Sequence, residues 1–256
     1  MTGLNGIETI NTLVVGGNGG IGFGFVQKLL SNPQIGTLYA TYRRQESASQ
    51  LLSLQQNHKT RLHCLPMDLT DESQISDSIR QIKQQTKTLH LVINCAGVLQ
   101  DDIVQPEKAL RQLDPDRLLH YFQINSIGPV LLAKHLLPLF RHSECSILAT
   151  ISAKIGSIGD NKLGGWYGYR ASKAALNMFM RTTAIEYQRR SPHTLVILLH
   201  PGTTDTNLSQ PFQRNVPPGK LFSVERTVNQ MWQIIENLEE SDRGKFFSWD
   251  GTTLPW

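Results

Sequence analysis

Two side chains four residues apart could transfer a proton together. Tyr169 and Lys173 carry a phenol and an ammonium at a spacing that places both on one face of a helix. A tyrosine with its ordinary pKa of about 10 is a poor base at neutral pH, but a nearby cation favours phenolate and lowers that pKa. The pair could therefore donate a proton during ketone reduction and accept one during alcohol oxidation. Tyr167 cannot form the same pair, because Ala171 lies four residues after it.

A glycine-rich turn near the start of the chain could bind the phosphates of a nucleotide. An apolar run ends in Gly-Gly-Asn-Gly-Gly-Ile-Gly at residues 16–22, and an apolar helical stretch follows directly. Such a turn presents backbone N–H groups and the positive end of a helix dipole to a phosphate. It predicts dinucleotide binding by Gly16, Asn18, Gly20, Ile21 and Gly22. A methyltransferase loop is the alternative, but it leaves the tyrosine–lysine pair unexplained.

The end of the second predicted strand bears on which dinucleotide is bound. An NAD-binding domain normally offers an acidic side chain to the ribose about 20 residues after the glycine turn. Here Arg43 and Arg44 follow the strand, and no acid comes before Glu46. A guanidinium pairs well with a 2′-phosphate, so these arginines favour NADP(H) over NAD(H). A basic turn in solvent is the alternative interpretation, and Arg43 is the expected contact because it comes first.

Apolar, β-branched runs alternate with amphipathic helical stretches along the chain. Strands are predicted at residues 9–15, 37–41, 61–65, 89–94, 146–152, 194–200 and 245–248. Helices are predicted at residues 20–30, 47–55, 72–85, 115–137, 166–188 and 224–238. This alternation predicts an α/β fold, a doubly wound Rossmann-type domain with a seven-stranded parallel sheet flanked by helices. No linker divides residues 1–256, so we expect one domain.

Turns that follow other strands should lie at the same sheet edge as the glycine turn, where ligands bind in such folds. Adenine and ribose contacts are expected from residues after the third and fourth strands, namely Asp68, Leu69, Asn94, Ala96 and Gly97. Simple turn formation is the alternative for both segments. Apolar walls of a substrate pocket could come from Trp166, Tyr167, Pro211, Phe212, Leu221 and Phe222, although these residues name no substrate.

Together these motifs resemble the short-chain dehydrogenase/reductase family over nearly the whole chain. The matches are Gly16, Gly20 and Gly22 for Gly-x-x-x-Gly-x-Gly, residues 94–97 for Asn-Asn-Ala-Gly, Tyr169 and Lys173 for Tyr-x-x-x-Lys, and Pro201 with Gly202 after the sixth strand. Residues 156–177 and 249–256 look like the C-factor and sniffer-type carbonyl reductase branch. The resemblance implies that Thr204 and Thr206 lie near the nicotinamide and phosphates, and that helices four and five form a homodimer or homotetramer.

The resemblance also implies a mechanism. Hydride would pass between nicotinamide C4 and a carbonyl carbon while Tyr169 protonates the oxygen, and Lys173 would also hold the nicotinamide ribose. Asn125 would join a water relay to solvent. Pro129 has no N–H group and cannot donate to the carbonyl of residue 125, which predicts a bent helix with a free carbonyl oxygen at that point.

The sequence departs from the family pattern at three positions. Val15 replaces a threonine, Cys95 replaces an asparagine, and Ala153 stands where the family commonly has its catalytic serine. We expect Ser152 to supply that hydroxyl, although a displacement of one residue at a strand end points a side chain to the opposite face. Ser157, or no serine at all, is the alternative.

Composition excludes several other classes of protein. A net charge of +4 and a pI near 9.0 over 256 residues are too mild to indicate nucleic-acid binding. Three widely spaced cysteines and scattered histidines indicate no disulfide framework and no metal site. The sequence shows no signal peptide and no membrane span, so we expect a cytoplasmic protein. The prediction is an NADP(H)-dependent oxidoreductase acting on a small carbonyl or alcohol, and the alternative is an NADP(H)-binding signalling or sensor protein of C-factor type with little turnover.

Overall fold

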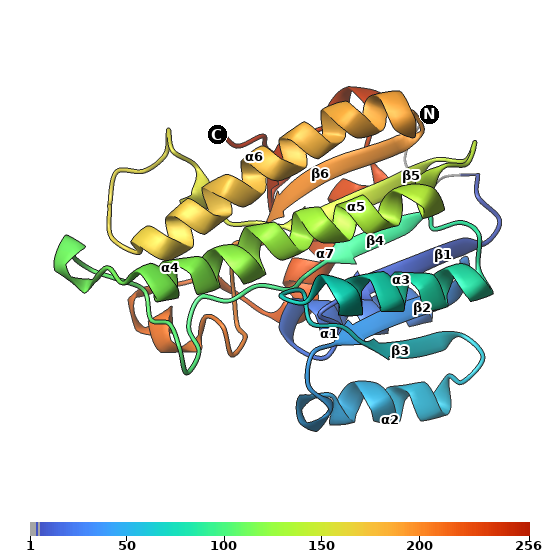
Figure 1. Cartoon of the computed structure of the whole chain (residues 1–256), viewed down its shortest axis with the longest axis horizontal. Helices are drawn as coiled ribbons and strands as arrows, with labels where there is room; N and C mark the ends of the chain where they lie inside the picture. The colour runs from blue at the N-terminus through green and yellow to red at the C-terminus, as the bar shows by residue number, and fades with distance from the viewer. Residues whose placement is uncertain (1–3, 5) are drawn as a thin grey trace.

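A computed structural model of the chain describes residue 4 and residues 6–256, and it is built around a parallel sheet (Figure 1). Seven strands pair in the order β3-β2-β1-β4-β5-β6-β9, and each pairing in this sheet is parallel. The strands are β1 (Ile10–Val15), β2 (Ile35–Tyr42), β3 (Leu62–Pro66), β4 (Leu91–Asn94), β5 (Ser146–Ile151), β6 (Thr194–His200) and β9 (Phe246–Ser248). The predicted doubly wound fold is confirmed.

Helices cover both faces of the sheet (Figure 1). They are α1 (Gly20–Ser31), α2 (Ser49–Asn57), α3 (Glu72–Gln85), α4 (Pro115–Phe122), α5 (Gly128–Phe140), α6 (Tyr167–Arg190) and α7 (Val224–Glu236). Successive side chains of a strand point to opposite faces, so Val14 joins the core under α1 and α7, and Leu13 joins the core under α3, α5 and α6.

A two-stranded sheet lies outside this frame and was not predicted. It pairs β7 (Thr203–Thr204) with β8 (Leu221–Phe222). Strands of two residues are too short to show a period-two pattern, so the sequence contains no signal for them. No helix among the described residues combines the length and the apolar character needed to span a bilayer.

The helix predicted at residues 115–137 is interrupted where Asn125 lies. A π-helical turn occupies Gln123–Ile127 between α4 and α5, and the Gly128 N–H donates to the carbonyl of Gln123, five residues back. Pro129 cannot donate the α-helical hydrogen bond to the carbonyl of Asn125, which accounts for an irregularity at this point. Such turns are frequent at functional sites. Here the turn places the Asn125 side chain fully inside the protein.

Candidate active site

The loops that follow β1, β4 and β6 meet at the carboxyl edge of the sheet. A methyl group added at Gly16 would lie 3.2 Å from the backbone nitrogen of Ala96, in the loop after β4. A methyl group added at Gly20 would lie 3.1 Å from Cγ2 of Thr206, in the loop after β6. The structure therefore brings together three segments that the sequence had assigned to one cofactor site.

The glycine turn, residues 16–22, needs its glycines for backbone reasons. Gly16 and Gly20 have φ angles of 74° and 50°, and a methyl group at Gly22 would lie 2.1 Å from the carbonyl oxygen of Gly16. Gly16 and Gly17 donate their N–H groups to the hydroxyl and carbonyl oxygens of Thr41, at 3.2 and 2.8 Å, which ties the turn to the end of β2. Because α1 has no side-chain cap, the first N–H groups of this helix could bind a phosphate.

The arginines predicted to bind a 2′-phosphate lie next to this turn. Arg43 and Arg44 are exposed, and neither guanidinium has a hydrogen-bond partner within the part of the chain that the structure describes. Asn18 donates through Nδ2 to the carbonyl and hydroxyl oxygens of Ser47, at 3.3 and 3.2 Å, and the Ser47 hydroxyl donates to the carbonyl of Arg44. Asn18 thus links the glycine turn to the arginine turn. Two exposed guanidinium groups beside a turn whose backbone N–H groups could bind a phosphate are compatible with the 2′-phosphate of NADP.

The turn residues after β3 and β4 mainly hold their own loops. Asp68 Oδ1 accepts the N–H and the hydroxyl of Thr70, at 2.9 and 2.8 Å. Leu69 is buried, and its carbonyl oxygen would lie 2.6 Å from a methyl group at Gly128. Asn94 Oδ1 accepts the Ala96 N–H at 3.1 Å, which shapes the loop beside Gly16. Local turn formation therefore accounts for the contacts that Asp68 and Asn94 make.

The loop after β6 places Thr204 and Thr206 in different surroundings, although both were expected near the cofactor. The Thr204 hydroxyl is buried and lies 2.8 Å from the hydroxyl of Thr227 in α7, whereas Thr206 is half-buried beside Gly20. Gly202, after Pro201, has a φ of 72°, and a methyl group there would lie 2.6 Å from the ring of Phe222. Only Thr206 of the two threonines therefore approaches the glycine turn.

Tyr169 and Lys173 lie on one face of α6 in a buried environment. Their side chains are 7% and 4% exposed, and Lys173 Nζ lies 5.9 Å from the centroid of the Tyr169 ring. Lys173 Nζ also donates to the carbonyl of Ile151 at the end of β5, at 3.2 Å. A methyl group at Gly97 would lie 3.2 Å from Asn125 Oδ1 and 3.4 Å from Lys173 Nζ. Glycine at position 97 thus lets the Asn125 amide and the Lys173 ammonium approach the same loop.

Asn125 connects that loop to α6. Its Oδ1 accepts the Val98 N–H at 2.8 Å, and its Nδ2 donates to the Val98 carbonyl at 2.9 Å and to the Ser172 hydroxyl at 3.0 Å. The Ser172 hydroxyl donates in turn to the carbonyl of Tyr169 at 2.9 Å. Ser172 was not predicted as a site residue, although it lies within residues 156–177 and between Tyr169 and Lys173, which the sequence had singled out.

Burial sets the protonation of the pair. Burial raises the pKa of the Tyr169 phenol and lowers the pKa of the Lys173 ammonium to about 8. The sequence predicted a lowered tyrosine pKa, and the structure gives the opposite direction. The reason is physical: a phenolate enclosed by apolar groups loses its hydration, and the burial of Lys173 weakens the cation that would compensate. A protonated Tyr169 is the form that can donate to a carbonyl oxygen.

An apolar cluster encloses Tyr169. Trp166 and Tyr121 lie with ring centroids 6.4 and 6.3 Å from that of Tyr169, and Phe212 lies 4.9 Å from Trp166. Ala153 and Ile155, from the loop after β5, pack against the same cluster. Phe222, predicted as a pocket wall, instead packs on Trp249 in the small sheet region, while Tyr167, Pro211 and Leu221 are exposed.

Residues 11–217 match the protein family described as short chain dehydrogenase. The chain belongs to this family. The NADPH-bound carbonyl reductase from chicken fatty liver is 28% identical, with 97% of this chain and 100% of that chain covered and a TM-score of 0.86. Carbonyl reductase Sniffer of D. melanogaster is also 28% identical with the same coverage, and its TM-score is 0.85. The C-signal protein of Myxococcus xanthus is 32% identical over 148 residues, which is 58% of this chain and 84% of that protein.

The hydroxyl groups of Ser152 and Ser157, which follow β5, bond to groups other than Tyr169. Ser152 is buried and donates to Asn177 Oδ1 at 2.6 Å, two helical turns away from Tyr169 along α6. The methyl group of Ala153 is the group that faces the Tyr169 cluster. The Ser157 hydroxyl accepts the Asp160 N–H at 3.2 Å. Neither serine hydroxyl is hydrogen-bonded to Tyr169, and the strand geometry explains why residues 152 and 153 differ.

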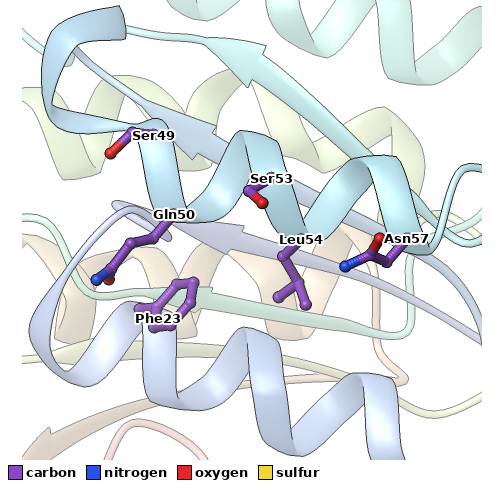
Figure 2. Close-up of a pocket in the computed structure, with 6 residues that line it drawn as sticks. All are labelled: Phe23, Ser49, Gln50, Ser53, Leu54 and Asn57. Atoms are coloured by element: carbon purple, nitrogen blue, oxygen red, sulfur yellow. The ribbon is translucent and has the colours of Figure 1, made fainter.

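Two other features of this family member lie away from Tyr169. A groove of about 500 Å³ runs between α1 and α2 and contains none of the predicted site residues (Figure 2). Its walls are Phe23, Ser49, Gln50, Ser53, Leu54 and Asn57.

At the opposite edge of the sheet, His90 lies 3.1 Å from Glu144 and its ring packs on His142. Because His90 Nδ1 accepts the Asn11 N–H at 3.0 Å, Nε2 carries the proton that bonds Glu144 and is not free to ligate a metal.

Proposed function

We propose that this short-chain dehydrogenase is an NADP(H)-dependent oxidoreductase that transfers hydride between nicotinamide and a small carbonyl or alcohol substrate. One observation carries the proposal: the buried Tyr169 and Lys173 lie beside Asn125 and Gly97, on the sheet edge that also holds the glycine turn. Two carbonyl reductases of the same fold, one of them NADPH-bound, support it.

The chain's own residues would bind the cofactor, orient the substrate and protonate the substrate's carbonyl oxygen. Bound nicotinamide supplies or accepts the hydride. Tyr169 is protonated at neutral pH, since burial raises a pKa that is ordinarily already about 10, and it donates that proton to the carbonyl oxygen. Lys173 holds the nicotinamide ribose from the same helix face. Asn125 keeps the loop after β4 against α6, and its carbonyl, which has no α-helical donor because of Pro129, takes the water that reaches Lys173.

The cofactor preference would come from the arginine turn. Arg43 and Arg44 lie beyond β2 without a carboxylate before Glu46, and their guanidinium groups can take a 2′-phosphate. The phosphates joining the two nucleosides would lie on the glycine turn, with Thr206 beside Gly20. Asn94, Ala96 and Gly97 would line the ribose side of the site.

A homodimer or homotetramer is part of the proposal. Large apolar side chains are exposed on α4 (Leu119), on the π-helical turn before α5 (Ile127) and on α6 (Met178, Phe179 and Ile185). Such side chains on neighbouring helices fit burial against a symmetry-related copy. The three cysteines are free thiols, which fits a reducing, cytoplasmic location.

A second candidate function is an NADP(H)-binding signalling or sensor protein with little turnover. Ala153 in place of a hydroxyl beside Tyr169 favours it, and so does the likeness to C-signal over 58% of the chain. The intact pair of Tyr169 and Lys173 favours the enzyme.

A panel of carbonyl compounds, followed at the nicotinamide absorbance with NADPH and NADH in separate runs, tests the proposal. We expect turnover with NADPH, a loss of about 10²- to 10⁴-fold in Tyr169→Phe, and unchanged NADPH binding by that variant. Tyr167→Phe is the matched control, because Tyr167 is 37% exposed and has no lysine four residues later. Wild-type turnover by Tyr169→Phe would contradict the proposed role, and NADPH binding without any turnover would favour the sensor.

A further inference from the structure

A buried carboxylate near Tyr169 has no part in the mechanism above. Glu107 belongs to the loop between β4 and α4 and is 4% exposed. Its Oε2 accepts the N–H of Gly168, at 3.1 Å, across 61 positions of sequence. Its backbone carbonyl accepts the N–H of Trp166. Oε1 is also buried and has no hydrogen-bond partner among the described residues. Two backbone donors at the start of α6 therefore depend on one residue of a distant loop.

Helix α6 lacks a cap of its own. The first N–H groups of any helix need partners outside the helix, and the residue before the first turn usually supplies one from its side chain. In α6 that residue is Trp166, whose indole cannot accept a hydrogen bond, and no side-chain cap forms. Glu107 takes this place with a carboxylate, the group that the positive end of a helix dipole stabilises best. The residue next to the bonded Gly168 is Tyr169.

The backbone just before α6 is strained. Gly164, Gly165 and Trp166 have consecutive φ angles of 65°, 67° and 53°, and Trp166 is the only residue other than glycine with a positive φ in the described part of the chain. A bulky residue adopts this left-handed backbone conformation only when the surrounding structure holds it there. Glu107 holds the turn from one side. Arg170 holds the other side by donating to the carbonyls of Gly165 and Gly164, at 2.9 and 3.1 Å.

The strained turn determines where Trp166 and Tyr169 lie. It directs the indole toward Tyr169 and Phe212. Behind the turn, a methyl group at Gly168 would lie 2.5 Å from a ring carbon of Tyr121 and 2.9 Å from Glu107 Oε1, so the packing leaves no space for a shift. In Figure 1 the loops leading into α4 and α6 lie at the same end of the molecule, as this contact requires.

We propose that Glu107 is a positioning residue for catalysis: it caps α6 from the loop after β4, anchors the left-handed turn of residues 164–166, and so fixes Tyr169 and Trp166 at the reaction site. This inference rests on the proposed function. It adds a residue outside every motif of the sequence, and it predicts that the reach of the side chain matters more than its charge.

Three substitutions at position 107 test the proposal in the full-length protein. Glu107→Gln keeps an acceptor at the same reach, Glu107→Asp keeps the charge but withdraws it by one methylene, and Glu107→Ala removes both. We expect kcat to fall about 10- to 100-fold in the Asp and Ala variants and less than about threefold in the Gln variant, because a misplacement of about 1 Å can cost 10²-fold in rate. The KM for NADPH should stay within about twofold in all three, since the glycine turn is untouched.

The matched control is Asp71→Ala. Asp71 caps α3 by accepting the N–H groups of Ser73 and Gln74, so its loss weakens a helix far from Tyr169. We expect a lower melting temperature and an unchanged kcat. A wild-type kcat in Glu107→Asp, or an equal loss of kcat in Glu107→Gln and Glu107→Asp, would overturn the proposal. The comparison of these two variants tests the proposal even if Glu107→Ala does not fold. A wild-type rate in Tyr169→Phe would instead refute the proposed function.

Discussion

The glycine turn of residues 16–22 and the start of α6, residues 164–173, form the two halves of the candidate site, and they are held in different ways. The glycine turn is shaped by its own backbone and bonded to the adjacent strand through Thr41. The start of α6 is shaped by side chains from other segments. Glu107 comes from one loop, and Asn125 comes from a π-helical turn.

This difference matches the two roles proposed for the regions, which are cofactor binding for the glycine turn and proton transfer for the start of α6. A phosphate site needs bare backbone N–H groups and a helix end, which a short run of glycines supplies. A proton donor needs a fixed position and a controlled pKa, so it requires burial and several partners. We therefore expect single substitutions in the glycine turn to abolish cofactor binding, and substitutions around α6 to alter rate or pH dependence with binding intact.

The largest expected effect is in the glycine turn. Gly22→Ala should lower the free energy of unfolding by about 3 kcal/mol and abolish measurable NADPH binding, because its methyl group would overlap the Gly16 carbonyl. Urea denaturation and a fluorescence titration with NADPH measure the two effects. Gly19→Ala is the control for stability, since Gly19 has extended backbone angles and no atom within 4 Å of an added methyl group. Normal NADPH binding by Gly22→Ala would show that the turn is not built as described.

The second prediction concerns the arginine turn. Arg43→Ala should weaken NADPH binding by about 1.5 to 3 kcal/mol and leave NADH binding unchanged, because only NADPH carries the 2′-phosphate. Kinetics with both cofactors measure the change in preference. Arg80→Ala removes an exposed arginine paired with Asp77 on α3 and controls for the loss of one positive charge. Equal losses for NADPH and NADH would count against a phosphate contact at residue 43.

The sequence predicted the first region of this comparison better than the second. The glycine turn with the helix after it and the seven strands follow from local pattern, because each depends on neighbours in the chain, whereas the phosphate contact of Arg43 stays a prediction. The Glu107 cap could not be predicted, since it joins residues 61 positions apart and Glu107 belongs to no motif. The direction of the Tyr169 pKa was missed for a related reason. Sequence spacing shows the nearby lysine, but only the fold shows that both groups are buried.

The third prediction uses the lowered pKa of Lys173. Burial brings this pKa to about 8, below the ordinary value of 10.5, so between those values the unfolded chain binds the extra proton and stability rises with pH. Relative to Lys173→Met, the wild type should gain about 2 kcal/mol in free energy of unfolding from pH 7 to pH 9.5. Denaturant titrations at both pH values measure this gain. Lys59→Met, at an exposed position, should show no such difference. A constant offset between wild type and Lys173→Met would contradict the burial of a titrating ammonium.

The smallest expected effect separates Ser152 from Ala153. Ser152→Ala should destabilise the protein by about 1 kcal/mol, because Asn177 Oδ1 loses its donor inside the core, and it should leave kcat within about twofold. Ala153→Ser should instead raise kcat about threefold or more, since it adds a hydroxyl on the side of the strand end that packs toward Tyr169. Steady-state kinetics and urea denaturation of both variants distinguish the two positions. A large loss of kcat in Ser152→Ala, with stability unchanged, would show that the Ser152 hydroxyl takes part in the reaction and does not merely stabilise α6 through Asn177.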